Sequence, residues 1–404
     1  MKSFCIVPRP SQKIIYSKLI RVLLLIDHSS KFCRRLLRGL VQYSKDHGPW
    51  LFYRLPSYYK TLHGEEGILK WAREWKADAI IAQGDEAGTS FLKCLQVPVI
   101  VQNYQGRSSC FSNLTGDYRG TGRIAARFFL QRRYRNFAFY GNKGVVWSME
   151  RAEGYKEEVE INGGDFYYFE TEALNGEEWG SSHEKLDQWL LSLPKPVALF
   201  ACDDHFALQV SLTCKLNSIA IPEDISLLGV DNDELICNLS DPPISSIELD
   251  VEKGGYETGR VLQQLVTEER TAPRNIVVNP VRFDLRKSTE KYNVANEYIR
   301  EVLHYIETSF TTPISIETLT RKVPLSRRSL ETKFKKEMDI SLYQFILKLR
   351  IDYFADLLLA RPELSLLDLA IRSGFNDSRN LSRIFKKMKG HTPTDYQKKF
   401  APVK

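Results

Sequence analysis

Short apolar runs alternate with amphipathic helical stretches over residues 20–290. Most runs are apolar at consecutive positions, as expected for strands covered on both faces. Strand–helix–strand alternation indicates parallel sheets. Because more than 250 residues of this alternation are too many for a single sheet, we predict two lobes, each with its own doubly wound sheet. The predicted strands are Val22–Ile26, Trp50–Leu55, Ala79–Gln83, Val97–Gln102, Asn136–Tyr140, Phe166–Phe169, Val197–Cys202, Ile225–Val230 and Ile276–Val281.

The pattern changes after Thr289, where strand-like runs stop and helical periodicity continues to the end of the chain. We therefore predict a two-lobed α/β sensing domain at 20–285, a polar linker at 286–294 and an all-α domain at 295–404. Residues 1–19 are expected to be a poorly ordered arm. The following apolar run, Ile20–Ile26, is too short for a membrane span and lacks a cleavage site, so it is neither a signal peptide nor an anchor.

The helical domain contains a repeat. Leu330–Lys336 and Leu381–Lys387 both have the pattern Leu-x-x-x-Phe-Lys-Lys, and each follows a short helix and a tight turn. Leu342–Leu359 is predicted to be one long helix between the two copies, because its apolar residues recur every three or four positions. The repeat therefore predicts two helix-turn-helix units on a rigid connector, and the second helix of each fits a DNA major groove.

Several exposed side chains on these second helices suit contact with bases or phosphates. Arginine can bind guanine through two hydrogen bonds, asparagine can bind adenine, and lysines near helix ends favour phosphate. Glu331 is an acidic departure that either accepts from cytosine or points outward. The candidates are Arg327, Arg328, Glu331, Thr332 and Lys335 in the first unit, with Ser378, Arg379, Asn380, Arg383 and Lys386 in the second.

Charge supports this prediction. From Lys291 onward there are 21 Lys and Arg against 13 Asp and Glu, whereas the preceding residues have 36 against 37. A basic tail favours a polyanionic partner, although a solvated helical surface would carry the same charge. The seven cysteines and seven histidines lack metal-ligand spacing, so we expect no metal, no cofactor and reduced thiols in the cytoplasm.

The stretch DLAIRSGFNDSRNLSRIFKKMKGHTPTDYQK at 368–398 resembles the DNA-binding domain of the AraC/XylS family, and the resemblance extends over about 295–400. It implies double-stranded promoter DNA and RNA polymerase as partners, and an activator rather than a repressor. It also implies base contacts at Arg328, Glu331 and Thr332, and at four residues of the second unit: Ser378, Arg379, Asn380 and Arg383.

The front of the chain resembles another group. NLTGDYRGTGRIAARFFLQRRYRNFAFYG at 113–141, RAEGY at 151–155 and IPEDISLLGVDNDEL at 221–235 are similar to LacI/GalR regulators and periplasmic sugar-binding proteins. That family pairs two lobes around a ligand cleft and implies a homodimer. A LacI-type sensor before an AraC-type domain resembles the activators of bacterial xylose operons, which implies D-xylose as the inducer.

Ligands of such sheets bind beyond the carboxyl ends of the strands, where acidic and amide side chains gather here. Carboxylates and a guanidinium can hydrogen-bond sugar hydroxyls, and an aromatic ring can cover the C–H face. Each candidate has a plainer alternative, since Arg151 could be a surface residue, Asp231 could cap a turn and Asp204 could cap the next helix. The candidates are Arg151, Asp203 and Asp231, then Trp147, Asp85 and Asp27, and finally Asp204.

Two alternatives for function remain open. An enzyme acting on a sugar or nucleotide is disfavoured because the chain lacks G-x-S-x-G, a Walker motif and zinc spacing. The glycines of Gly116–Gly122 are not a phosphate loop, and a helix packed tightly on a sheet would explain them. The second alternative keeps DNA binding but changes the ligand to another sugar, a purine or a peptide.

Overall fold

The computed structural model describes residues 19–27, 30–55, 58–84, 86–171, 179–267, 272–361, 364–375 and 380–400. The predicted arm at 1–19 therefore lies outside the described residues except for its last position. Within the described part, no helix is both long and apolar enough to cross a bilayer. The chain forms two compact units, one of residues up to Thr115 with Gly254–Ile276, the other of Gly116–Lys253 with Val277 onward.

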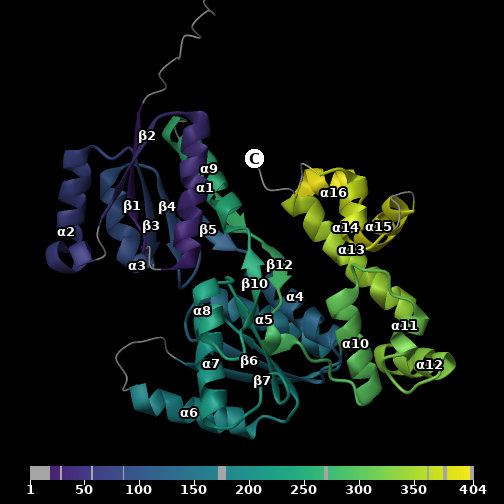
Figure 1. The fold of residues 1–404 in the computed structure, drawn as a ribbon. Helices are drawn as coiled ribbons and strands as arrows, with labels where there is room; N and C mark the ends of the chain where they lie inside the picture. The colour runs from purple at the N-terminus through teal and green to yellow at the C-terminus, as the bar shows by residue number, and fades with distance from the viewer. Residues whose placement is uncertain are drawn as a thin grey trace, which may run out of the picture. The chain divides into compact units, whose positions relative to one another are not determined.

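The first unit is a six-stranded sheet between helices. Its strand order is β11 (Asn275–Val278), β5 (Ser112–Gly116), β4 (Val99–Asn103), β3 (Ala79–Gly84), β1 (Ile20–Leu25) and β2 (Trp50–Arg54), and β1 to β5 pair in parallel. Figure 1 shows α2 (Tyr58–Trp75) on one face of this sheet, with α1 (Lys31–His47) and α9 (Val251–Thr267) on the other. The short helix α3 (Glu86–Thr89) and the 3-10 turn Ser90–Leu95 follow β3.

A second six-stranded sheet begins the other unit. Its order is β12 (Pro280–Asp284), β10 (Ser245–Leu249), β9 (Ile225–Val230), β8 (Val197–Ala201), β6 (Asn136–Asn142) and β7 (Asp165–Thr171), parallel except for β12 against β10. Its helices are α4 (Tyr118–Gln131), α5 (Val146–Ile161), α6 (Trp179–Ser192), α7 (Asp204–Leu216) and α8 (Glu234–Leu239). Two largely parallel sheets followed by helices confirm the predicted fold class.

The helical part packs around two cores. The first core gathers α10 (Glu297–Ser309), α11 (Ile316–Thr320) and α12 (Arg327–Met338), and the second gathers α14 (Leu366–Arg372), α15 (Leu381–Lys389) and α16 (Pro393–Phe400). Helix α13 (Leu342–Ala360) supplies side chains to both, Phe345 to the first and Phe354 to the second. At a rise of about 1.5 Å per residue, this connector is roughly 28 Å long. The predicted rigid connector is therefore present.

Every predicted apolar run lies on an observed strand, and Ile276–Val281 spans parts of β11 and β12. The run analysis does not predict β5 or β10, because both contain polar residues. The two strands are nevertheless buried at every position. Ser245 in β10 shows why burial is tolerated, since its Oγ donates to the carbonyl of Arg286 and lies 2.6 Å from Thr289 Oγ1.

Helices α4 and α5 approach each other closely through glycine. Asp117 caps α4, accepting at 2.9 Å from the N–H of Gly120. The prediction that a sheet accounts for the close packing of Gly122 is wrong, because its neighbours belong to α5. A Cβ added at Gly122 would lie 2.1 Å from the carbonyl oxygen of Arg151, and one at Gly154 would lie 2.0 Å from that of Arg119. The two backbones therefore meet where any side chain would separate them.

Gly122→Ala is expected to lower the free energy of unfolding by about 1–3 kcal/mol, because the new methyl would overlap backbone atoms that cannot rotate away. Gly106→Ala is the matched control, since nothing lies within 4 Å of a Cβ there. Thermal melts of both variants check the prediction. Equal melting temperatures for the two variants would contradict it.

Candidate functional site

The candidate ligand site on the second sheet is built at the carboxyl ends of β6, β8 and β9. Asp203 follows β8 and caps α7, with Oδ1 accepting at 2.8 Å from the N–H of Phe206. Asp231 follows β9 with φ +94°, a left-handed conformation that non-glycine residues seldom adopt. Trp147 and Arg151 come from α5, the helix after β6. The strand ends thus bring four of the predicted ligand residues to one edge of one sheet.

Arg151 is the centre of this cluster and is only 3% exposed. One Nη donates to the carbonyl oxygen of Cys202, and the other lies 4.0 Å from Oδ1 of Asp231. The guanidinium also lies over two aromatic rings, at 5.3 Å from the centroid of Trp147 and 5.6 Å from that of Tyr118. Arg151 is therefore not a surface residue, and its fork is fixed beside an acid and two rings.

Two buried atoms of the cluster lack a partner. Arg151 Nε and Asp231 Oδ1 have no hydrogen bond among the residues that the structure describes. An unpaired buried polar atom costs about 1–3 kcal/mol, so native proteins usually satisfy such atoms with water or ligand. The Asp231 side chain as a whole is 30% exposed, which leaves its other oxygen within reach of solvent. The Nε–H donor of Arg151 and the Oδ1 acceptor of Asp231 are therefore both available to a ligand.

The loop that carries Asp231 is fixed by hydrogen bonds of Asn232, a residue that the sequence analysis does not single out. Asn232 is 3% exposed, and its N–H donates at 2.9 Å to Ser246 Oγ. Its side-chain amide donates at 2.6 Å to Glu248 and accepts at 2.7 Å from Arg286. These bonds fix the strained loop. Tyr118 is also missed by the sequence, although its position directly after the capping Asp117 was a usable signal.

Burial raises the pKa of both carboxyl groups in the cluster. For Asp203 and Asp231 alike, desolvation is the largest cause, and the Arg151 guanidinium opposes it. The negative charge of Asp203 also raises the pKa of Asp231. An arginine, two acids and aromatic rings can hydrogen-bond several hydroxyls and cover an apolar face. Among described residues, no group of three or more His, Cys, Asp or Glu could hold a metal ion.

Asp204 does not cap α7, because Asp203 does that. Its side chain is buried, with Oδ1 accepting at 2.6 Å from Ser246 Oγ and Oδ2 accepting at 2.6 Å from the N–H of Asp233. The interpretation that Asp204 caps the next helix is therefore wrong, and the ligand contact of Asp204 stays a prediction. Asp204 connects α7 to β10 and to the loop after β9, and both carboxylate oxygens are already occupied.

The candidates in the first unit are separate. Asp27 follows β1, is exposed, and its N–H donates at 2.9 Å to Oε1 of Gln83. Asp27 and Gln83 line a mostly apolar cavity of about 220 Å³ that also includes Tyr59 and Phe91. Asp85 lies outside the described residues. This cavity lies at the carboxyl ends of β1 and β3, where ligand contacts were predicted.

The first candidate nucleic-acid helix is α12. Ser326 caps it, and Leu330 and Phe334 face the core. All five predicted contact residues are exposed: Arg327, Arg328, Glu331, Thr332 and Lys335. Glu331 points outward and accepts at 3.2 Å from Nε of Arg327, which also lies 3.9 Å from Glu317. Arg327 is thus held by two acids, whereas Arg328 is the stronger candidate for base contact.

The second candidate helix is α15, which begins at Leu381 and has Asn380 as its N-cap residue. Asn380, Arg383 and Lys386 are exposed, while Ser378 and Arg379 lie outside the described residues. Ser365 caps the preceding helix, α14, by accepting at 3.1 Å from the N–H of Asp368. The side chain of Asp368 then accepts from Ser365 Oγ at 2.6 Å, so this is not a reciprocal capping box.

Comparison with known proteins supports both parts. Residues 126–289 match the periplasmic binding protein-like domain, and residues 319–399 match a helix-turn-helix domain. The xylose operon regulatory protein of Haemophilus influenzae is 27% identical over 328 residues, covering 79% of this chain and 84% of that protein. The protein of that name from Escherichia coli strain K12 is 23% identical over 401 residues, covering 95% of this chain and 98% of that protein.

Solved structures agree on the fold. The structure of a xylose-binding transcription activator matches with a TM-score of 0.59 and 22% identity, covering 96% of this chain and 100% of that chain. A complex of the regulator CelR with cellobiose matches with a TM-score of 0.54 and 19% identity over 67% of this chain and 84% of that chain. The matched domains and relatives are those of regulators rather than enzymes. The chain is therefore a transcription regulator in which a periplasmic-binding-protein-like domain precedes a helix-turn-helix domain, and it is similar to xylose operon regulatory proteins along almost its whole length.

Proposed function

We propose that this regulator binds a sugar, D-xylose, through the cluster around Arg151, and that the bound sugar controls its grip on promoter DNA. The observation that carries the proposal is the pair of unpartnered buried atoms, Arg151 Nε and Asp231 Oδ1. A hydroxyl both donates and accepts, so one sugar hydroxyl or two neighbours can satisfy both atoms. Asp203 would accept from a further hydroxyl, and Trp147 would cover the C–H face.

D-xylose is favoured over other ligands by the names of the relatives, which are regulators of xylose operons. Asp27 and Asp85 are proposed ligand contacts of the first unit, since Asp27 lines a cavity at the carboxyl ends of strands of that unit. We further propose sensing by residues 20–285, a linker at 286–294 and DNA binding by residues 295–404.

On the DNA side, α12 and α15 would enter successive major grooves of a promoter half-site. Arg328, Thr332, Asn380 and Arg383 would contact base edges, while Lys335 and Lys386 near the helix ends would bind phosphate. Ser378 and Arg379 would add base contacts at the start of the second unit. We propose that the regulator is a cytoplasmic homodimer that activates transcription through RNA polymerase, since AraC-type domains generally do so.

Isothermal titration calorimetry of the full chain with a panel of pentoses and hexoses tests the ligand. We expect D-xylose to bind at one site per chain, and to bind at least tenfold more tightly than D-glucose or L-arabinose. Adenine and hypoxanthine serve as controls for the purine alternative. Binding of a hexose or a purine without binding of D-xylose would contradict the proposed inducer.

A further inference from the structure

The segment between the second sheet and the helical domain is packed against both. Ser288 is fully buried, and its Oγ donates at 2.6 Å to the carbonyl of Leu227 in β9. Further along, the Asn293 N–H donates at 2.8 Å to the carbonyl of Arg132, and Val294 is buried in the core that holds α10 and α12. Residues 288–294 are therefore held against both the lobe that contains the second sheet, here called the sensing lobe, and the first helix-turn-helix unit.

Arg132, at the end of α4, is the centre of this junction. Its side chain is 8% exposed, and an Nη lies 2.9 Å from Oε1 of Glu307 in α10. Nε donates at 3.3 Å to the carbonyl of Thr289, and the guanidinium lies 3.9 Å from the ring centroid of Phe128 and 4.9 Å from that of Tyr292. The Tyr292 hydroxyl donates at 2.7 Å to the same oxygen of Glu307. A buried charge pair thus joins α4 to the helical domain.

Arg133, the next residue, reaches α12 itself. It has φ +68°, and an Nη lies 2.7 Å from Oδ2 of Asp339, the residue that ends α12. The ion pair is largely exposed, at 36% and 69% of the two side chains, so it contributes little to stability. The position of this ion pair is what matters for DNA binding, because it contacts the carboxyl end of α12, a helix proposed to lie in the DNA groove.

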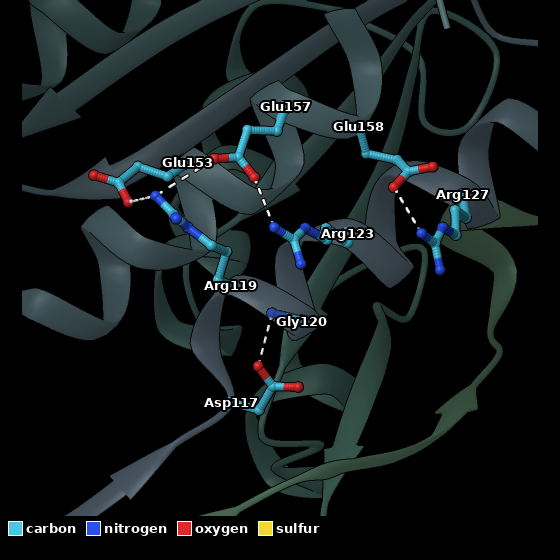
Figure 2. A network of polar contacts seen from close by, with 8 residues as sticks. All are labelled: Asp117, Arg119, Gly120, Arg123, Arg127, Glu153, Glu157 and Glu158. Atoms are coloured by element: carbon cyan, nitrogen blue, oxygen red, sulfur yellow. Dashed lines mark hydrogen bonds and ion pairs between the residues drawn. The ribbon is translucent and has the colours of Figure 1, made fainter. Parts of the chain in front are cut away.

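The other end of this connection is the ligand cluster. Figure 2 shows Arg119, Arg123 and Arg127 of α4 facing Glu153, Glu157 and Glu158 of α5. Besides these ion pairs, the two helices touch through glycine, since Gly122 of α4 packs against the carbonyl oxygen of Arg151 in α5. The side chain of Arg151 is the centre of the ligand cluster. Helices α4 and α5 therefore form a stiff pair, with the ligand residues on α5 and the junction at the end of α4.

We propose that Arg132 and Arg133 are positioning residues that hold the first helix-turn-helix unit to the sensing lobe and transmit the occupancy of the ligand cluster to α12. This inference rests on the proposed function for its ligand, but the junction itself does not depend on which sugar binds. A ligand can shift DNA affinity in this way only if the sugar-bound and sugar-free states of the protein place the DNA-binding helices differently. A stiff helix pair fixed at both ends is a physical route for that difference.

The test uses the full chain, D-xylose and a DNA duplex selected from random sequence by the wild-type protein. Arg133→Asn and Asp339→Asn remove the exposed ion pair, and asparagine tolerates the positive φ of both positions. We expect unchanged sugar affinity by calorimetry, and a fall of about 2- to 30-fold in the change of DNA affinity that sugar produces. The double variant should match either single variant, because both substitutions break one interaction. Glu307→Gln should show the same loss at the buried pair, and Arg133→Lys should restore the response.

Lys215→Gln is the matched control. It breaks an exposed ion pair with Asp241, at 3.1 Å, on the same lobe but in α7. This variant should respond to sugar as the wild type does. If the junction variants weaken DNA binding equally with and without sugar, or keep the full response, the proposal is overturned.

Hydrogen exchange separates this proposal from the proposed function. In the absence of sugar, Glu307→Gln should lose protection at residues 286–296 while the control retains it, because Glu307 pairs with Arg132 and accepts from Tyr292. If the wild type ignores D-xylose but Glu307→Gln loses this protection, the junction holds and the proposed ligand is wrong. Unchanged protection in Glu307→Gln would overturn the junction, whatever sugar does.

Discussion

Asp204→Ala is expected to lower the free energy of unfolding by about 2–5 kcal/mol, whereas Asp204→Asn should retain wild-type stability at neutral pH or exceed it. Alanine would leave the Ser246 hydroxyl and the Asp233 N–H, now bonded to the carboxylate at 2.6 Å each, without an acceptor. Each buried orphan costs about 1–3 kcal/mol. Asparagine can accept from the Asp233 N–H and donate to the Ser246 oxygen, so both contacts survive without a buried charge.

The same substitution should change how stability depends on pH. Burial, followed by the nearby Asp231 charge, raises the pKa of Asp204 well above its usual value in the folded chain. A group whose folded pKa is raised binds a proton more readily when folded. Its contribution to stability is therefore fully present below the unfolded pKa and is lost as the pH rises through the folded pKa. In Asp204→Asn this loss should disappear, so the stability of the variant should exceed that of the wild type increasingly as the pH rises.

Urea unfolding of wild type, Asp204→Ala and Asp204→Asn at a series of pH values checks both expectations. Asp233→Ala is a useful comparison, because it keeps the N–H that Asp204 accepts from and removes a side chain that caps α8 by accepting at 3.2 Å from the N–H of Leu235. Sugar affinity should be nearly unchanged in Asp204→Asn, since Asp204 is not among the proposed ligand contacts. Loss of sugar binding in a stable Asp204→Asn variant would show that the buried assignment is wrong.

The strands that the sequence predicts are those whose apolar residues are consecutive, and the two it misses are buried through polar contacts. In β5, Asn113 has an amide that donates at 3.0 Å to Ser108 and to Asn275, so a polar side chain fills an interior position. Runs of hydrophobicity cannot reveal such a position, because one of its partners, Asn275, lies 162 residues away in the chain. Register and lobe assignment likewise depend on long-range pairing.

The sequence could predict which residues gather at the candidate site, but not what each of them contacts. Family resemblance places Arg151, Asp203 and Asp231 together, and the structure brings these three to one sheet edge. The sequence could not decide which of the adjacent acids Asp203 and Asp204 is available, since that depends on contacts with β10. For the same reason it could not show that Arg327 is held by acids, or that α4 ends at a buried charge pair with α10.

Arg151→Ala is expected to weaken D-xylose binding by about 30- to 1000-fold, the largest effect on ligand affinity of any single substitution here. The change removes a fork of donors and leaves two carboxyl groups without their cation. Because Arg151 lowers the pKa of both Asp203 and Asp231 against the effect of burial, its loss should raise both pKa values further. The remaining sugar affinity should consequently vary with pH over a range where wild-type affinity is more nearly constant.

Calorimetry on a small set of variants separates lost contacts from an uncompensated charge. Lys156→Ala, an exposed cation of the same helix paired with Glu160 at 3.7 Å, should bind sugar like the wild type. Arg151→Lys keeps the charge but not the fork, so it should recover only part of the affinity. If Asp231→Asn partly restores binding in the Arg151→Ala background, the unpaired carboxylate accounts for that share of the loss. Wild-type affinity in both Arg151→Ala and Asp231→Asn would instead place the sugar elsewhere, since the unpartnered Nε and Oδ1 atoms would then have no part in holding it.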